Sequence, residues 1–315
     1  MAAATIRENS RYENKMHGSM EFPYVIYHSR IPDYLYSYPL HWHNEMEIIY
    51  VISGSCTITI NRLPVQVYAG DIIFILPDTL HSIDRHEHNK VDFFNIVFDI
   101  RLLESATPSD ACFDRYLRPY LESQIQIPAV ISSSHPQYPE LQLTLGRLIQ
   151  NHELAVPGCE LYIKSQLFTL FWLLEPLKTG AEENISRSHS AQIRKMKDLL
   201  QLISIHYANP LSLKDAASFC GYSIPHFMKF FKSFTGSTFV EYLNTYRLKK
   251  AGELLLSTDL TVLEVSEAVG FDNHSYFIRL FKRYYGTTPK KHRRQTDSGA
   301  SDPYQPFTAP DNPSV

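Results

Sequence analysis

Three histidines and one glutamate in the N-terminal third of the chain carry side chains that could bind a metal ion or a polar small molecule. His41, His43 and Glu47 are separated by even numbers of residues, so they face the same side if they lie on one continuous strand. His81 follows after the turn that begins at Gly70. Imidazoles and a carboxylate are adequate ligands for zinc, iron or nickel, so one hypothesis is a metal centre. The other is a polar pocket for a small-molecule effector.

Aromatic side chains are concentrated around the same residues and favour the effector hypothesis. Stacking surfaces beside polar groups suit a sugar or another polar organic ligand. We therefore expect an effector site without a resident metal or cofactor, although any single tyrosine could instead be a core or rim residue. The expected effector contacts are Tyr36, Tyr38, His41, Trp42, His43, Glu47 and His81, and Tyr34 and Tyr50 lie in the same stretch.

Two short segments in the C-terminal third have cationic, hydrogen-bonding and isolated apolar side chains on one helical face. A helix in the major groove of DNA uses charge for phosphates, forked donors for guanine and apolar contact for thymine methyls. We expect both faces to contact double-stranded DNA, and the alternative is that each is an ordinary solvated face. The expected contacts are Pro225, Met228, Lys229 and Lys232 in the first segment, and His274, Ser275, Ile278, Arg279 and Lys282 in the second.

These segments belong to a repeated unit that spans residues 212–236 and 261–286. The copies align at an offset of 50 after the turn and 49 before it, so the second turn is one residue longer. Ser212 and Thr261 are typical helix caps, and Gly221 and Gly270 stand where a first helix ends with a positive φ. Large apolar residues then recur at the spacing of a buried helix face. Each copy is therefore predicted to be a helix-turn-helix unit.

A longer helix is predicted between the two units, over residues 239–256. About 18–20 residues would span roughly 30 Å. This length is close to the ~34 Å that separates successive major-groove faces of B-DNA. Both second helices could therefore meet one side of the duplex.

The run of residues 270–289, followed by Arg293 and Arg294, closely resembles the C-terminal signature of AraC/XylS-type bacterial transcription regulators. The resemblance implies two helix-turn-helix subdomains on a linker helix, with base contacts at the exposed positions named above. It also implies a homodimer and contact with RNA polymerase. Pro225 and Met228 depart from the usual pattern of the first copy, so we expect the second copy to read more of the operator.

The N-terminal part alternates short β-branched and aromatic runs with turn residues, a pattern typical of a sandwich or small barrel. The pattern H-x-H-x3-E from His41, followed by Gly54, resembles the first motif of the cupin barrel, whereas residues 77–81 match its second motif poorly. Strands are predicted at residues 24–27, 47–53, 56–61, 66–68, 71–76 and 92–98, and helices at residues 112–123, 139–152 and 161–177.

The expected fold is a two-domain α+β protein: a cupin-like β-barrel with packed helices, followed by an all-α double helix-turn-helix domain. The helix at 161–177 has an apolar stripe that could form a dimer contact or pack on the barrel. The expected division is a flexible arm at 1–22, an effector and dimerisation domain at 23–178, a linker at 179–191, the DNA-binding domain at 192–294 and a disordered tail at 295–315.

Charge is segregated between these parts. The chain has a net charge of −3, but residues 191–294 hold 16 Lys and Arg against 8 Asp and Glu, and the remainder holds 14 against 25. A basic C-terminal part fits a nucleic-acid partner. Four scattered cysteines fit a reducing cytoplasm, and no segment resembles a signal peptide or a membrane span. We expect a cytoplasmic, effector-responsive transcription regulator, and the alternative is a metal-dependent cupin enzyme with an attached helical domain.

Overall fold

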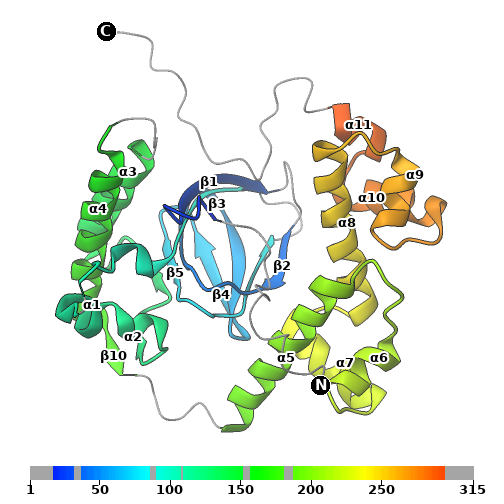
Figure 1. Ribbon diagram of the computed structural model, residues 1–315, viewed down its shortest axis with the longest axis horizontal. Helices are drawn as coiled ribbons and strands as arrows, with labels where there is room; N and C mark the ends of the chain where they lie inside the picture. Colours follow the sequence, from blue (N-terminus) through cyan, green and yellow to red (C-terminus); the bar gives the residue numbers. More distant parts are fainter. Residues whose placement is uncertain are drawn as a thin grey trace.

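The computed structural model describes residues 17–31, 37–85, 90–107, 109–151, 157–180 and 187–294. A central β-sheet is covered on one side by helices of the N-terminal part and on the other by the helical C-terminal part (Figure 1). This arrangement confirms the predicted two-domain α+β layout. The expected tail, most of the expected arm and residues 181–186 of the expected linker lie outside the described residues.

One eight-stranded sheet is organised around β3, a strand of 15 residues. The first half of β3 pairs antiparallel with β7 and β5, and its second half pairs with β4 and β6. β2 extends the sheet from β6, β1 from β7 and β9 from β5. The bounds are β1 (Tyr24–Ile31), β2 (Ser37–His41), β3 (Met46–Ile60), β4 (Leu63–Tyr68), β5 (Ile72–Ile75), β6 (His81–Arg85), β7 (Val91–Phe98) and β9 (Val130–Ile131).

Gly54 lies within β3, so the two strands predicted at 47–53 and 56–61 are one strand. Its φ is +83°, and a Cβ atom there would lie 1.8 Å from the carbonyl oxygen of Lys90. Only glycine tolerates both conditions, so this residue bends the strand without ending it. Among the described residues, backbone hydrogen bonds do not close the sheet into the expected barrel. We use "barrel" below for this curved sheet.

Among the strands that escaped the sequence prediction, β2 and β6 matter most for the site. β2 contains Pro39, and β6 is polar along most of its length. Neither has the apolar alternation of a typical strand. These two strands nevertheless pair with each other and carry three of the expected effector residues, Tyr38, His41 and His81.

The helices of the N-terminal part pack on the sheet through their apolar faces. Pro119 interrupts the single helix predicted at 112–123, because proline cannot continue a helix beyond its first turn. The predicted stripe on the last helix packs on the sheet at Leu167, Leu170 and Leu174, whereas Leu161 is 76 % exposed. The bounds are η1 (Ile100–Leu103), α1 (Ala111–Tyr116), α2 (Arg118–Leu121), α3 (Tyr138–Gln150), α4 (Cys159–Leu174) and η2 (Glu175–Leu177).

Within the described residues, the C-terminal part consists of seven helices, which include both predicted helix-turn-helix units and the linker helix between them. The first helix begins inside the stretch expected to be a linker, which also contains a two-residue strand, β10 (Thr179–Gly180), paired with β8 (Ile125–Gln126). The bounds are α5 (Arg187–His206), α6 (Leu213–Phe219), α7 (Ile224–Thr235), α8 (Phe239–Ser257), α9 (Val262–Ala268), α10 (His274–Tyr285) and α11 (Pro289–Arg294).

The caps of the two units follow the predicted chemistry. Ser212 and Thr261 each accept a hydrogen bond from the backbone three residues later and form reciprocal capping boxes with Asp215 and Glu264. Gly221 and Gly270 have φ values of +66° and +87°. Asn273 caps α10 with its side chain, whereas Ser223 stands at the cap of α7 without a side-chain bond.

The two units are fastened to each other through α8. From this helix, Arg247 donates from Nε to the carbonyl oxygen of Tyr207 (2.6 Å) and from Nη2 to that of Asn209 (3.0 Å), both in the segment between α5 and α6. A Cβ atom at Gly270 would lie 2.5 Å from the carbonyl oxygen of Ala208, so this close approach requires glycine. The turn of the second unit is thus held directly against the segment that leads from α5 into the first unit.

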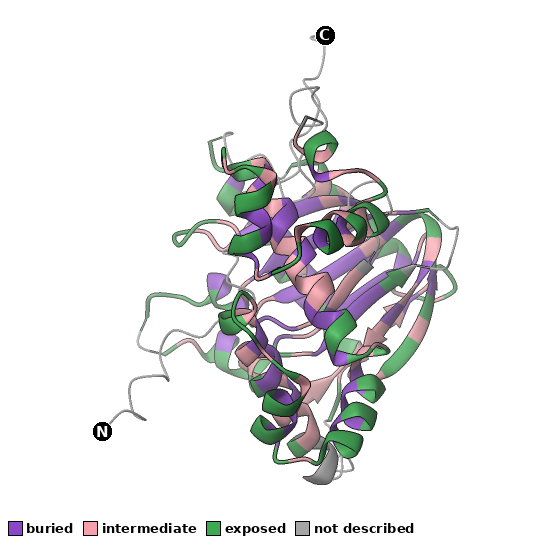
Figure 2. Cartoon of the chain, turned by 90° about the vertical axis from the view of Figure 1, so that its right-hand side faces the viewer, coloured by how far each residue is buried: buried purple, intermediate pink, exposed green. Residues whose placement is uncertain are grey.

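The first unit also packs on the barrel, through contacts that we call the docking interface. Leu40, Trp42 and Leu80 share one apolar cluster with buried residues of α5 to α8. The hydroxyl of Tyr242 in α8 donates to the carbonyl oxygen of Leu40 (2.7 Å), and Nζ of Lys197 in α5 lies 2.6 Å from Oδ1 of Asp78. Figure 2 shows that the outer faces of the helices remain exposed while buried residues gather towards the sheet.

Candidate functional site: two exposed helices and a buried histidine cluster

The second helix of the first unit, α7, presents the expected contact residues to solvent. Phe227, Phe230, Phe231 and Phe234 are buried. The opposite face is exposed at all four expected positions, and Met228 is 50 % exposed. These exposed positions are Pro225, Met228, Lys229 and Lys232.

The second helix of the second unit, α10, repeats this arrangement. Phe277 and Phe281 are buried, and three expected contacts are exposed: Ser275, Arg279 and Lys282. The other two expected contacts, His274 and Ile278, are half-buried, and Ile278 packs against the core of the second unit. The exposed expected contacts of α10 therefore offer a hydroxyl, a guanidinium and an ammonium group.

Other exposed side chains of these two helices, among them His226, Tyr276 and Arg283, were not among the expected contacts. His226 is exposed in the first turn of α7, and its ring lies edge-on to Tyr222. Tyr276 is exposed on α10, where the guanidinium of Arg279 lies 5.4 Å from its ring centre. Tyr276 directly follows the expected contact Ser275, so its place in the first turn of α10 was the signal in the sequence that could have identified it.

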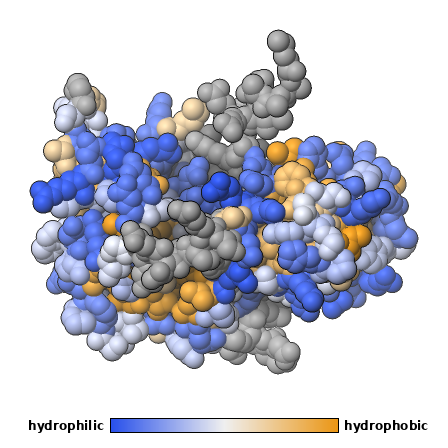
Figure 3. Space-filling view, turned by 90° about the horizontal axis from the view of Figure 1, so that it is seen from below, coloured by the Kyte–Doolittle hydropathy of each residue, from blue (hydrophilic) through white to orange (hydrophobic). Residues whose placement is uncertain are grey.

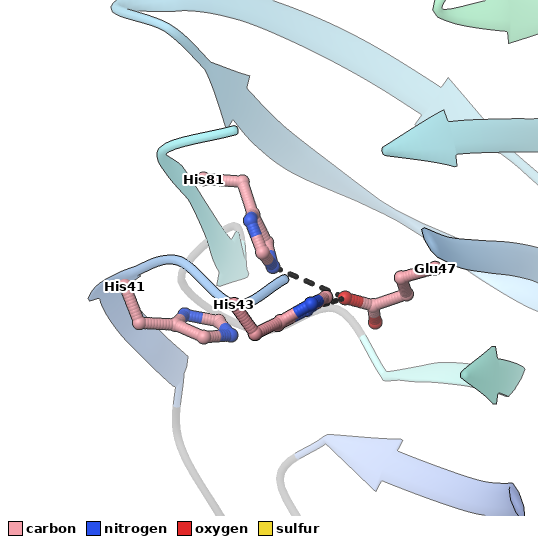
Figure 4. Close-up of side chains that lie close together, drawn as sticks. All are labelled: His41, His43, Glu47 and His81. Atoms are coloured by element: carbon pink, nitrogen blue, oxygen red, sulfur yellow. Dashed lines mark hydrogen bonds and ion pairs between the residues drawn. The ribbon is translucent and has the colours of Figure 1, made fainter. Parts of the chain in front are cut away.

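In the barrel, the four polar residues expected at the effector site do converge. The candidate ligand atoms of His41, His43, Glu47 and His81 all lie within 4.8 Å of one another, and they meet inside the sheet (Figure 4). Oε2 of Glu47 is 3.1 Å from Nε2 of His43 and 3.1 Å from Nε2 of His81. His43, Glu47 and His81 are buried, and His41 is half-buried. We call these four residues the histidine cluster.

The cluster is assembled differently from the sequence prediction. His41, His43 and Glu47 do not share a continuous strand, because β2 ends at His41 and β3 begins at Met46. The intervening turn brings Glu47 alongside the histidines. His81 opens β6 and pairs directly with His41 of β2.

Two opposing effects act on the carboxyl group of Glu47. Burial alone would raise its pKa, but the hydrogen bonds and positive charge of His43 and His81 outweigh burial. The pKa of Glu47 therefore lies well below its usual range, so Glu47 is a buried carboxylate. A buried carboxylate needs cationic or hydrogen-bonding neighbours. The cluster is thus a concentrated polar site within an apolar sheet.

Two of the aromatic residues expected at the same site, Tyr38 and Trp42, make their contacts elsewhere. Trp42 belongs to the docking interface, where Nζ of Lys197 lies 5.7 Å from its ring centre. Tyr38 contacts Phe93 in the sheet, and Nζ of Lys249 in α8 lies 5.7 Å from its ring. Tyr36 lies outside the described residues, as does Tyr34. The structure thus brings together the histidines and the glutamate but separates Tyr38 and Trp42 from them.

The face of the molecule seen from below is mostly hydrophilic and carries smaller apolar patches (Figure 3). Within the described residues, no helix is long and apolar enough to cross a membrane. All four cysteines are free thiols.

Two family models match the chain. One describes an AraC-like ligand binding domain and matches residues 23–171. The other describes a helix-turn-helix domain and matches residues 216–295. The first contains the histidine cluster, and the second contains α7 and α10.

Several known proteins are similar to this chain over most of its length. The uncharacterized HTH-type transcriptional regulator YdeC of Bacillus subtilis is 27 % identical over 88 % of this chain and 94 % of that protein. The Msm operon regulatory protein of Streptococcus mutans is 26 % identical over 79 % of this chain and 84 % of that protein. Among solved structures, ToxT from Vibrio cholerae is 14 % identical over 86 % of this chain and 96 % of that chain, with a TM-score of 0.43.

Proposed function

Because the chain belongs to the AraC family of transcription regulators, we propose that it binds its operator through the exposed faces of α7 and α10 and adjusts this binding to a ligand held in the barrel. The observation that carries the proposal is the repeated pair of helices. Each buries an aromatic face in its own unit and presents cations and polar groups on the other. The alternative of a metal-dependent cupin enzyme rests on the histidine cluster alone, and the relatives above are named as regulators.

Charge supports DNA as the partner of the exposed faces. Residues 191–294 hold 16 Lys and Arg against 8 Asp and Glu, although the whole chain is slightly acidic. Lys229 and Lys232 on α7 correspond in the repeat to Arg279 and Lys282 on α10, so each unit offers two cations at equivalent positions. Cations at such positions neutralise phosphates and release condensed counterions.

The base contacts should be divided unequally between the helices. α10 offers Arg279, whose planar fork can pair with O6 and N7 of guanine, together with Ser275 and the added polar group of Tyr276. α7 offers Pro225 and Met228, which lack strong donors, and Lys229. We therefore assign most of the sequence discrimination to α10 and mainly backbone contacts to α7.

The barrel supplies the ligand-binding half of the proposed function. The histidine cluster gathers four polar side chains in the interior of the barrel. The docking interface connects the barrel to the first helix-turn-helix unit. A ligand that changes the position of β2 can therefore act on α7 and α8 without reaching the DNA surface. We place the boundary between ligand-binding and DNA-binding domains in the expected linker, before α5, and place the protein in the cytoplasm with its DNA.

A second copy of the chain is the proposed partner for the outer face of α4. Leu161, Phe168 and Trp172 recur on this helix at helical spacing and are exposed, and Trp172 is 72 % exposed. Contiguous exposed apolar residues favour an interaction surface. Trp172→Lys should shift the protein towards monomer in sedimentation experiments, whereas Lys214→Glu, a charge change at an exposed position of α6 in the C-terminal part, should not.

A salt titration with DNA tests the function directly. Full-length protein should select a specific sequence from a random pool, and the logarithm of its affinity should fall linearly with the logarithm of salt concentration. The expected slope corresponds to several phosphate contacts. A flat salt response, or no selected sequence, would refute DNA recognition by these helices.

A further inference from the structure

The space between the four side chains of the histidine cluster matches a single ion. Glu47 Oε2 lies 3.1 Å from two imidazole nitrogens, and all four ligand atoms lie within 4.8 Å of one another. Metal bonds of about 2.0–2.2 Å place two ligands of one ion roughly 3 to 3.5 Å apart. A sugar ring does not fit between atoms this close, so the cluster itself does not match the organic ligand expected from the sequence.

The hydrogen bonds behind the three rings orient them for this purpose. Nδ1 of His41 lies 2.8 Å from the carbonyl oxygen of Pro39, Nδ1 of His43 lies 3.0 Å from that of Glu45, and Nδ1 of His81 lies 2.9 Å from that of Thr79. A carbonyl oxygen only accepts, so each Nδ1 carries the hydrogen. When neutral, each ring therefore presents a lone pair at Nε2. Histidines that bind metals are commonly held in this way by their other nitrogen.

The arrangement at Glu47 calls for a cation. When His43 and His81 are neutral, their lone pairs at Nε2 are directed at a carboxylate oxygen, which has no hydrogen to donate. Buried acceptors facing one another are costly. The ion pairs with Glu47 therefore need a proton on Nε2 of each of these two rings. One central cation would take the place of both protons and satisfy all four residues.

The chain segments that carry these ligands are also the segments on which the DNA-binding domain docks. Leu40 and Trp42 alternate with His41 and His43, and they belong to the apolar cluster of α5 to α8. Leu80, which precedes His81, belongs to the same cluster. Asp78, three residues before His81, holds Lys197 of α5. A shift of the ligands on binding therefore moves residues that touch the first helix-turn-helix unit.

We propose that His41, His43, Glu47 and His81 bind one divalent transition-metal cation and that occupancy of this site controls operator binding. Three imidazoles and one carboxylate suit zinc, iron(II) or nickel, and not calcium or magnesium, which prefer oxygen. The inference rests on the proposed function, because it names the class of ligand that the barrel senses. Bound metal fixes β2 and the start of β6 and thereby the docking interface.

Metal content tests the site itself. Full-length protein without a histidine tag, purified without chelator, should contain about one equivalent of zinc, iron or nickel by mass spectrometry. Glu47→Gln and His81→Gln should each retain less than about one tenth of it, while His28→Gln, a histidine paired with Asp92 outside the cluster, should retain all. Should a cluster variant fail to fold, chelator-stripped wild-type protein is titrated with Zn²⁺ against a chromophoric chelator. Absence of binding in that titration overturns the proposal.

Operator affinity tests whether metal occupancy controls DNA binding. With DNA selected from a random pool, stripped and Zn²⁺-loaded protein should differ in affinity by about five-fold or more, the lower end of typical coupling between two sites. Tyr242→Phe removes the hydrogen bond to Leu40 but no metal ligand. It should keep the full metal content and show a smaller difference between the stripped and loaded states.

The possible outcomes distinguish a failure of the metal site, a failure of the control by metal and a failure of the proposed function. Stoichiometric metal with equal operator affinity in both states overturns the control by metal. A protein that binds metal but selects no DNA in either state refutes the proposed function and the control, while the metal content alone establishes the site. Selective DNA binding without any metal binding overturns the metal site and leaves the proposed function standing.

Discussion

The two helix-turn-helix units are near copies in sequence, yet different parts of the chain contribute residues to their cores. The core of the first unit includes Leu40, Trp42 and Leu80 of the barrel. Within the described residues, the core of the second unit is confined to the C-terminal part, and its buried members come from α8 onwards. Duplication has therefore produced one unit that depends on the barrel and one that is self-contained.

This difference separates two tasks that a regulator must perform. A ligand in the barrel can reach the first unit directly through the docking interface. It can reach the second through α8, through the contacts of Arg247 and Gly270, and through Tyr38, which interacts electrostatically with Tyr284 of α10. The self-contained unit is also the one with the better set of base-reading side chains. The unit that contacts the ligand-binding barrel is therefore not the unit that supplies most of the expected base contacts.

The largest expected effect comes from matched core substitutions. Phe231→Ala and Phe281→Ala occupy equivalent repeat positions and should each cost about 3–5 kcal/mol in the free energy of unfolding of their unit. Only Phe231→Ala should also increase hydrogen exchange in the barrel, at β2 and the segment before β6. Urea unfolding and segment-resolved hydrogen exchange measure both effects. Equal exchange in the two variants would contradict the asymmetry between the units.

The next effect concerns base recognition at equivalent positions. Arg279→Ala should weaken operator binding by roughly 10- to 100-fold and hardly change binding to unrelated DNA, because a bidentate guanine contact is worth about 1–3 kcal/mol of discrimination. Lys229→Ala should weaken operator binding less than Arg279→Ala does. It should weaken binding to unrelated DNA by about the same factor as binding to the operator. Both are measured by fluorescence anisotropy. If Arg279→Ala lowers the two affinities alike, Arg279 contacts phosphate.

The helix caps should behave alike in both units, because they depend only on local structure. Ser212→Ala and Thr261→Ala should each lower the stability of their unit by about 1 kcal/mol. Accepted hydrogen bonds from the capping residues hold the pKa of Asp215 and of Glu264 below their usual values. A lowered pKa in the folded state means that the cap stabilises at neutral pH and that this contribution is lost as pH falls and the carboxylate is protonated. Thermal unfolding at neutral and acidic pH measures the loss, and a cap contribution that is independent of pH would contradict it.

The smallest effect is expected at the phosphate contacts. Lys232→Ala and Lys282→Ala should each lower operator and random-DNA affinity by a similar factor and reduce the salt slope by about one unit. The two variants should be nearly indistinguishable, because the equivalent lysines meet a uniform backbone. A change in sequence preference for either one would assign that lysine to base recognition.

Sequence reasoning succeeded where the signal was local. The capping residues Ser212 and Thr261, the positive φ of Gly221 and Gly270, and the phenylalanine face of α7 are all set within a few residues of one another. The histidine cluster was also identified, although on the mistaken premise of one continuous strand. The types of its residues, more than their secondary structure, made it recognisable.

Sequence reasoning failed where tertiary contacts decide. β2 and β6 lack apolar alternation and exist because each pairs with the other. Trp42 was assigned to the pocket because of its neighbours, yet the alternation that places His41 and His43 on one side places Trp42 on the other. That alternation was visible in the sequence. The partner on the far side, α5 to α8, was not, because no local pattern indicates docking between distant segments.

The clamp between the two units has a consequence for the arrangement of the operator. Arg247 and the close approach of Gly270 to Ala208 leave little freedom for α10 to move relative to α7. The distance and angle between the two DNA-reading helices are therefore fixed. One base pair inserted between the two half-sites rotates them by about 35° relative to each other, since a turn of B-DNA takes 10–10.5 base pairs. The protein cannot follow this rotation. Either the duplex must twist or bend, or one of the two helices loses its base contacts.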